Sequence, residues 1–181
     1  MSQASRVPMH RLMAGDLSLE PLLASHADAM FEVLSDPAIY EYENEPPASV
    51  YALRDRYARL ESRLSPDGEE IWLNWVVRLG TGELIGFVQA TLRPGGQAAV
   101  AYEMNSAYWG RGLASQALQA MLLELVERYQ VRDLWAVLKR ANHRSQRLLQ
   151  RAGFVMTSSA EHVRRRIAAD EMLMHLAVPP E

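Results

Sequence analysis

Residues 108–115 read Tyr-Trp-Gly-Arg-Gly-Leu-Ala-Ser and separate a stretch with strand character from a long apolar helix. Gly110 and Gly112 allow the backbone to turn tightly and to approach a ligand without a Cβ in between. The small residues Ala114 and Ser115 follow in the first helical turn, where several amide N–H groups have no intrahelical partner. Such amides, together with the helix dipole, favour a phosphate or pyrophosphate group. Taken alone, the spacing fits a simple glycine-assisted helix start at least as well.

The segments around this turn predict a single α+β domain over residues 1–181, with elements in the order βααβββαβαββ. Alternating, β-branched and aromatic residues predict strands at Leu17–Leu19, Ile71–Leu79, Leu84–Leu92, Ala98–Met104, Leu134–Leu138, Phe154–Met156 and Glu171–Val178. Apolar residues at helical spacing predict helices over residues 27–34, 49–64, 113–126 and 143–151. We expect Ser25 and Asp28 to form a capping box for the first helix, and Gly153 to occupy the C′ position after the last.

The composition of the chain excludes several kinds of site and makes several kinds of partner unexpected. Hydrophobic residues make up 49% of the chain, charged residues 23%, and the net charge is −3, which is ordinary for a globular protein. We expect no nucleic-acid partner, no membrane span and a cytoplasmic location, because basic patches, long apolar runs and a secretory signal are not seen. The chain contains no cysteine, which excludes disulfides, thiolate metal sites and a cysteine nucleophile. Its five histidines are scattered without ligand spacing, so we expect no metal.

The glycine turn is neither a P-loop nor a dinucleotide fingerprint, because it lacks the Lys-Ser/Thr pair and the third glycine. Residues 109–117 instead resemble the pyrophosphate loop of the GNAT acetyltransferase superfamily, although Trp109 stands where the general form has Gln or Arg. The pattern Tyr-Trp-Gly-Arg-Gly-x-Ala is similar to the RimJ/RimL branch, the ribosomal-protein N-terminal acetyltransferases. Matching segments follow in the family's order at Ser35-Asp36-Pro37, residues 82–86, Asn142-His143-Arg144-Ser145 and Ala152-Gly153-Phe154.

This resemblance implies a GNAT-type fold, with a mixed, mainly antiparallel sheet split between its fourth and fifth strands, Ala98–Met104 and Leu134–Leu138. Acetyl-CoA would lie in the split and give its acetyl group directly to a primary amine in a ternary complex. The resemblance implies the following cofactor-binding residues: Met104, Gly110, Arg111, Gly112, Leu113, Ala114, Ser115, Asn142 and Ser145. Asn142 is equally suited to N-cap a helix, and the two roles are compatible.

The attacking amine must be neutral, so a carboxylate or a water relay is expected near the split. Glu103 is the first candidate, although it also fits a solvent-facing position on an alternating strand. Leu149 stands where many family members have a tyrosine that protonates the leaving thiolate, and Ser145 is a substitute acid. Gln116 replaces a glutamate that is common in the RimJ/RimL branch. Glu41, Glu43 and Glu45 lie in the loop that borders the family's acceptor site, where they would attract an amine or simply be solvated.

The sequence does not decide whether the acceptor is a protein N-terminus or a small molecule, because the loops rather than the fold determine the acceptor. A non-catalytic acyl-CoA-binding sensor is an alternative that Leu149 favours, and a longer acyl donor such as succinyl-CoA is another. The sequence does not determine the oligomeric state. Related enzymes are often homodimers, and by that analogy the strand carrying residues 172–174 is a candidate to pair across an interface.

Overall fold

One sheet organises the molecule, which is described by a computed structural model for residues 7–179. Its strands are β1 (Leu12–Ala14), β2 (Leu17–Pro21), β3 (Ile71–Leu79), β4 (Leu84–Arg93), β5 (Gln97–Met104), β6 (Asp133–Lys139), β7 (Val155–Met156) and β8 (Glu171–Ala177). Their order in the sheet is β1-β2-β3-β4-β5-β6-β8-β7. Every neighbouring pair is antiparallel except β5 and β6, which are parallel. The predicted α+β, GNAT-type fold with a mixed, mainly antiparallel sheet is therefore confirmed.

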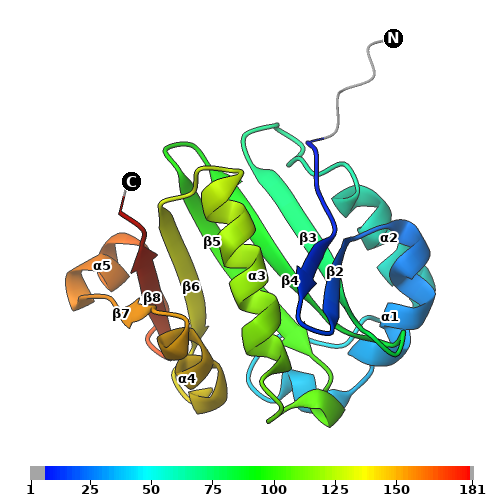
Figure 1. Cartoon of the computed structure of the whole chain (residues 1–181). Coiled ribbons are helices and arrows are strands. Elements are labelled where there is room, and N and C mark those ends of the chain that lie inside the picture. The colour runs from blue at the N-terminus through cyan, green and yellow to red at the C-terminus, as the bar shows by residue number, and fades with distance from the viewer. Residues whose placement is uncertain (1–6, 180–181) are drawn as a thin grey trace.

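Helices cover both faces of the sheet (Figure 1). They are α1 (Ala27–Leu34), α2 (Val50–Leu60), α3 (Leu113–Glu127), α4 (His143–Arg151) and α5 (Ser159–Arg164), with short 3-10 turns at Ala24–His26, Pro37–Tyr40 and Ser106–Tyr108. α3 and α4 pack with Trp75 and Val88 in the larger core, whereas α1 and α2 pack with Val76 and Leu84 in a second, smaller core. Because side chains alternate along a strand, each face of β3 and β4 supplies its own core.

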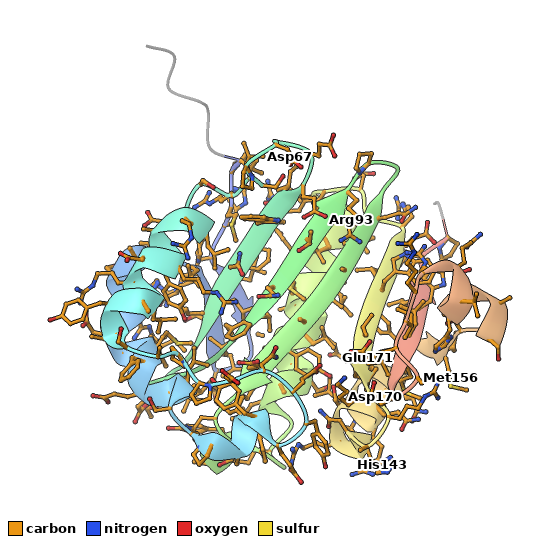
Figure 2. The ribbon with its side chains drawn as sticks, turned by 180° about the vertical axis from the view of Figure 1, so that it is seen from behind. Asp67, Arg93, His143, Met156, Asp170 and Glu171 are labelled. Carbon is orange, nitrogen blue, oxygen red and sulfur yellow. The ribbon has the colours of Figure 1, made fainter. Side chains whose placement is uncertain are left out.

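The sheet opens between β5 and β6. Only three residue pairs join these strands, Gln97 with Asp133, Ala98 with Leu134 and Ala99 with Trp135. Beyond Ala99 the two strands diverge toward their carboxyl ends, which Figure 2 shows from the side opposite to Figure 1. The predicted split between Ala98–Met104 and Leu134–Leu138 is thus present, and it places the ends of both strands at the mouth of a cavity.

β4 approaches β5 unusually closely at the end of β5. Gly86 is the register partner of Met104, and a Cβ built on Gly86 would lie 2.1 Å from the Glu103 carbonyl oxygen and 2.9 Å from the Met104 Cα. Both contacts are with backbone, which cannot move aside cheaply. Gly86 therefore fixes the backbone position of the two residues at the open end of β5.

Several local expectations were wrong. Ser25 does not cap the first helix, because it lies in a 3-10 turn that begins after Leu23, and the His26 ring accepts the Leu23 amide at 3.0 Å. Asp28 instead binds Arg54 of α2 at 2.7 Å. The second helix ends at Leu60 rather than at residue 64, since Arg63 adopts a positive φ of 61°.

Regions near both ends of the chain also differ from expectation. β1 and α5 were not predicted, because each is too short to show a period. β8 is not an edge strand, since β6 pairs along its whole length and β7 covers part of its other side. Met172, Leu173 and Met174 are each at most 5% exposed, so they are core residues of this chain and are not available to pair across an interface.

Candidate active site

A cavity of about 580 Å³ occupies the split. Its walls come from the loop after α1, from α2, from β3 to β6, and from the start of α4. Five of the residues proposed from the sequence line it, namely Glu103, Met104, Ala114, Asn142 and Ser145. The others do not line it: Gly110, Arg111 and Gly112 lie in the turn that leads into α3, and Leu113 and Ser115 lie in the first turn of that helix.

The glycine turn has the backbone and the open space that an anionic ligand needs. Gly110 and Gly112 have φ angles of 72° and 75°, in the left-handed region that L side chains rarely adopt. A Cβ at either position would have no heavy atom within 4 Å. Gly112 is the N-cap of α3 and offers no side chain to cap it, so the first amides of the helix stay open. The turn therefore fits a pyrophosphate, and the Arg111 guanidinium lies beside it, over the Tyr108 ring.

The backbone of Met104 is directed into the split. The Asn105 amide donates to the Ile85 carbonyl at 2.9 Å, which makes Met104 and Gly86 a non-hydrogen-bonded pair of the β4–β5 ladder. The Met104 N–H and C=O consequently point away from β4. Trp109 donates its indole N–H to the Met104 carbonyl at 2.8 Å, and the Met104 amide remains directed at the open side. This end of β5 can therefore pair with an extended ligand as a further strand would.

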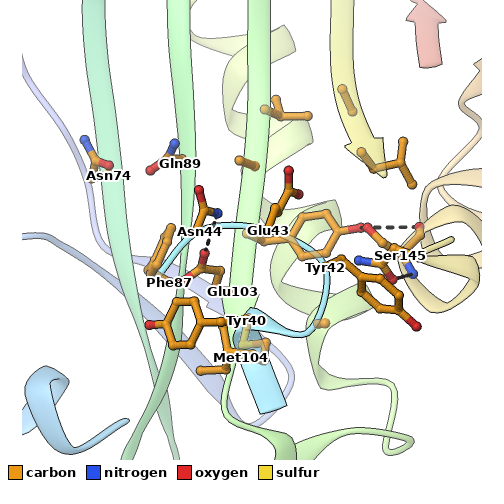
Figure 3. A pocket seen from close by; sticks show the side chains of 18 of the residues that line it. Tyr40, Tyr42, Glu43, Asn44, Asn74, Phe87, Gln89, Glu103, Met104 and Ser145 are labelled. Carbon is orange, nitrogen blue, oxygen red and sulfur yellow. Dashed lines mark hydrogen bonds between the residues drawn. The ribbon is translucent and has the colours of Figure 1, made fainter. Parts of the chain in front are cut away.

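Glu103 faces the other side of the same strand, toward the loop after α1 (Figure 3). Asn44 donates to the Glu103 carboxylate at 3.3 Å, and it holds this position with a positive φ of 65°. Burial raises the pKa of Glu103 above its ordinary value, while the Asn44 hydrogen bond and the Arg56 charge act to lower it. Glu103 is therefore a half-buried carboxylate at the cavity wall and not a solvent-facing residue of an exposed strand.

The acidic loop contributes unequally to the cavity. Glu43 and Glu45 line it, whereas Glu41 does not. Burial raises the pKa of Glu43, and the nearby Lys139 ammonium acts in the opposite direction. The loop itself is held by Asp36, which accepts the Ala38 amide at 3.0 Å and the Ser106 amide at 2.7 Å. The Ser-Asp-Pro segment thus ties the loop to the end of β5.

Ser145 lies at the opposite wall, in the first turn of α4. Asn142 N-caps that helix by accepting the Ser145 amide at 3.1 Å, which confirms the capping role that the sequence allowed. The Tyr102 hydroxyl lies 2.6 Å from the Ser145 hydroxyl, and burial raises the pKa of Tyr102 to about 12. Leu149 also lines the cavity and is buried. Sequence reasoning missed Tyr102, because only the fold brings this β5 residue and α4 together.

A second contact missed from the sequence joins the two sides of the split. The Arg144 guanidinium lies 3.4 Å from the centroid of the Trp109 ring, and both residues line the cavity. The contact is a cation–π interaction between α4 and the turn that leads into α3. The indole of Trp109, which stands where the general pattern has Gln or Arg, therefore links the two sides of the split.

Two further features bear on the chemistry. Within residues 7–179, no group of three or more His, Asp or Glu side chains is placed to hold a metal ion. Among the same residues, no helix has both the length and the apolar character to cross a membrane.

Comparisons with known proteins agree with the geometry. The family model of the acetyltransferase (GNAT) domain matches residues 16–155. An uncharacterized N-acetyltransferase of Bacillus licheniformis, p20, is 26% identical over 116 residues, which span 63% of this chain and 65% of that protein. The match thus covers less than two thirds of the relative's length.

Solved structures share the fold at low identity. RimL, a ribosomal alpha-N-protein acetyltransferase in complex with coenzyme A, superposes with a TM-score of 0.76 at 17% identity over 93% of this chain and 98% of that one. RimJ of Mycobacterium smegmatis, in complex with a CoA disulfide, gives 0.75 at 20% identity over 93% and 86%. The microcin C7 self-immunity acetyltransferase, in complex with acetyl-CoA and AMP, gives 0.73 at 12% identity over 91% and 93%.

Proposed function

The chain belongs to the GNAT acetyltransferase family, and from this membership we propose that it transfers the acetyl group of acetyl-CoA to a primary amine. The observation that carries the proposal is the open split between β5 and β6, with a glycine turn at its mouth and a half-buried carboxylate in its wall. Acetyl-CoA supplies the reactive thioester. The amides around residues 110–115 would hold its pyrophosphate, and Asn142 and Ser145, which line the cavity, would contact the cofactor there.

The transfer would be direct, because the chain has no cysteine to carry an acyl group. Glu103 would accept a proton from the attacking amine, for which a raised pKa is suited, since an effective base has a pKa near the working pH. The Met104 amide would donate to the oxygen of the thioester carbonyl as the amine adds to its carbon. The carbon–sulfur bond then breaks, and the electron pair leaves with the sulfur.

Ser145 would deliver a proton to the departing sulfur, with the Tyr102 hydroxyl beside it to replace that proton. Tyr102 keeps its own proton at neutral pH, because burial raises its pKa to about 12. This pair offers a hydroxyl on the cavity wall in a chain whose position 149 is leucine. It therefore weakens the main reason for regarding the protein as a non-catalytic acyl-CoA sensor.

The test is thiol release from acetyl-CoA with a panel of amines that holds N-terminal peptides, free amino acids, polyamines and aminoglycosides. The protein adds no thiol of its own to the signal. We expect release above the no-amine rate with one acceptor class. Coenzyme A binding without thiol release for any amine would favour the acyl-CoA sensor. Faster thiol release from succinyl-CoA than from acetyl-CoA would show that the donor is succinyl-CoA. Absence of binding would contradict the proposed site at the glycine turn.

A further inference from the structure

The cavity continues past Glu103 as a polar channel under α2. Asn74 of β3 and Gln89 of β4 are register partners on its floor, and Figure 3 shows their side chains next to each other. A smaller hollow of about 180 Å³ shares Arg56, Asn74 and Gln89 with the main cavity. The main cavity and the hollow thus run together along this face of the sheet.

Distances along the sheet are set by the register. Glu103 pairs with Phe87, and Gln89 lies two residues further along β4 on the same face. Diagonal neighbours of this kind are about 7–8 Å apart at their Cα atoms. Gln89 therefore lies within the length of one amino acid from Glu103, and Asn74 lies one strand further away.

The polar groups of this channel lack protein partners. Among residues 7–179, the side-chain amides of Asn74 and Gln89 form no hydrogen bond, although Asn74 is only 7% exposed. The Tyr57 hydroxyl is buried and has no partner among the same residues. Arg56 forms no hydrogen bond or ion pair with a described residue, yet it is close enough for its charge to act on Glu103. Buried polar groups are normally hydrogen-bonded, so the unpartnered Asn74 and Tyr57 side chains, next to the partly buried Gln89 and the exposed Arg56, indicate a ligand.

All four groups can donate hydrogen bonds. The Arg56 guanidinium carries a positive charge and a planar set of donors that matches a carboxylate, and the amides and the Tyr57 hydroxyl each add an N–H or O–H. The opposite end of the channel holds the carboxylates of Glu103 and Glu43, which suit an amine. The channel thus has a cation-binding end and an anion-binding end.

We propose that the acceptor carries a carboxylate within one residue's length of its amine, with the amine at Glu103 and the carboxylate at Arg56, Asn74, Gln89 and Tyr57. This inference rests on the proposed transfer reaction and names its substrate class. A free amino acid and a peptide that begins with Asp or Glu both present this chemistry. Polyamines and aminoglycosides, which have no carboxylate, are expected to be poor acceptors.

The experiment compares acceptors that differ only in the carboxylate. Free amino acids with an uncharged side chain are tested against their α-carboxamides, and tripeptides beginning with Asp or Glu against those beginning with Asn or Gln. The readout is kcat/KM for thiol release from acetyl-CoA. We expect the carboxylate member of a pair to be preferred by about 10-fold or more, as a hydrogen-bonded charge would give. Preference among free amino acids or among peptides distinguishes the two sources.

Substitutions in the channel test which residues cause the preference for a carboxylate. Arg56→Gln should raise KM for the carboxylate acceptors about 10-fold more than KM for the carboxamide acceptors, whereas any change in kcat through the pKa of Glu103 should be the same for both members of a pair. Asn74→Asp should reverse the preference, because it adds a negative charge to the floor of the channel. Arg59→Gln is the matched control, since Arg59 is an exposed arginine of the same helix that does not line the cavity. Equal kcat/KM within each pair, or an equal loss for both members in Arg56→Gln, would overturn the proposal.

A binding measurement separates this proposal from the transfer reaction itself. Calorimetry with the same acceptor pairs, in the presence of coenzyme A, needs no turnover. Tighter binding of carboxylates that is lost in Arg56→Gln, without thiol release, would support the channel and contradict the transfer. Thiol release together with equal binding of both members of a pair would support the transfer and contradict the channel.

Discussion

Glu103, the proposed general base, lies in an environment that disfavours its charged form. The folded state raises its pKa above 4.5, chiefly because the carboxylate loses water on burial. The folded protein therefore holds this proton more tightly than the unfolded chain does. Between pH 4.5 and the raised pKa, stability decreases as pH increases, and the loss persists above that window. The same residue is thus expected to favour catalysis and to oppose folding at neutral pH.

Replacing Glu103 with Gln tests both effects. We expect kcat to fall by about 10²–10⁴-fold, as is typical when a general base is removed, with coenzyme A affinity unchanged. The melting temperature at pH 8 should be equal to or higher than that of the wild type, and any gain should shrink toward pH 4.5. Initial rates and thermal melts at several pH values measure this, with the exposed Glu127→Gln as the control. A fully active variant would show that Glu103 takes no part in the reaction.

The Tyr102–Ser145 pair is expected to act as one unit. Tyr102→Phe and Ser145→Ala should each lower kcat by about 10-fold, a modest loss because a thiol with a pKa near 8.5 leaves readily on its own. The double variant should lose little more than either single variant, since each change interrupts the same proton path. Steady-state kinetics of all four proteins form the double-mutant cycle. Independent, multiplicative losses would show that the two hydroxyls do not share a function.

The turn before α3 makes a prediction at the level of an element. Gly112 and Gly68 have φ angles of 75° and 76°, and neither would bring a Cβ within 4 Å of another heavy atom. Alanine at either position should therefore cost about 1 kcal/mol of stability, the usual penalty for the left-handed region. Only Gly112→Ala places a methyl group at the open start of α3. We expect it to weaken coenzyme A binding at least 10-fold, whereas Gly68→Ala should bind normally, as calorimetry would show.

The elements also show what a sequence can and cannot predict. Long elements with a clear period, such as β3, β4 and α3, were predicted within one or two residues of their observed ends. Short elements such as β1 and α5 left no such pattern. The predicted helix caps follow the same rule. The cap at Asn142 was predicted because its partner is an amide of its own helix, whereas the cap at Asp28 was wrong because its partner lies on α2, 26 residues away.

Site residues follow a similar rule. The turn at residues 110–115 was singled out by its resemblance to the family's loop, because its spacing alone fits a simple helix start equally well, and its backbone angles fit the proposed anion site. Tyr102 acquires its partner only when β5 and α4 meet across the split. Contacts between elements that are distant in sequence were the part that periodicity could not supply.

The whole molecule consists of two sets of strands that are joined weakly. β1 to β5 form one set and β6 to β8 the other, and three residue pairs near Ala98 connect them. A ligand in the split contacts both sets and binds only the folded protein, so it should stabilise the fold by about 2.7 kcal/mol at 100 times its Kd. Hydrogen exchange should slow most at residues 100–104 and 136–139, and least in the centre of β3. Uniform slowing over the sheet would contradict a ligand seated in the split.

The indole of Trp109 lies where these sets of strands face each other. It donates to the Met104 carbonyl on one side, and the Arg144 guanidinium covers its ring from the other. The fluorescence of an indole is sensitive to the charges and the polarity around it, so a ligand bound in the cavity should change the fluorescence of Trp109. Trp75, by contrast, is fully buried and should stay constant. The difference between the fluorescence of the wild type and that of Trp109→Phe would then give the signal of Trp109 alone. This signal would follow ligand binding in the cavity without an attached dye.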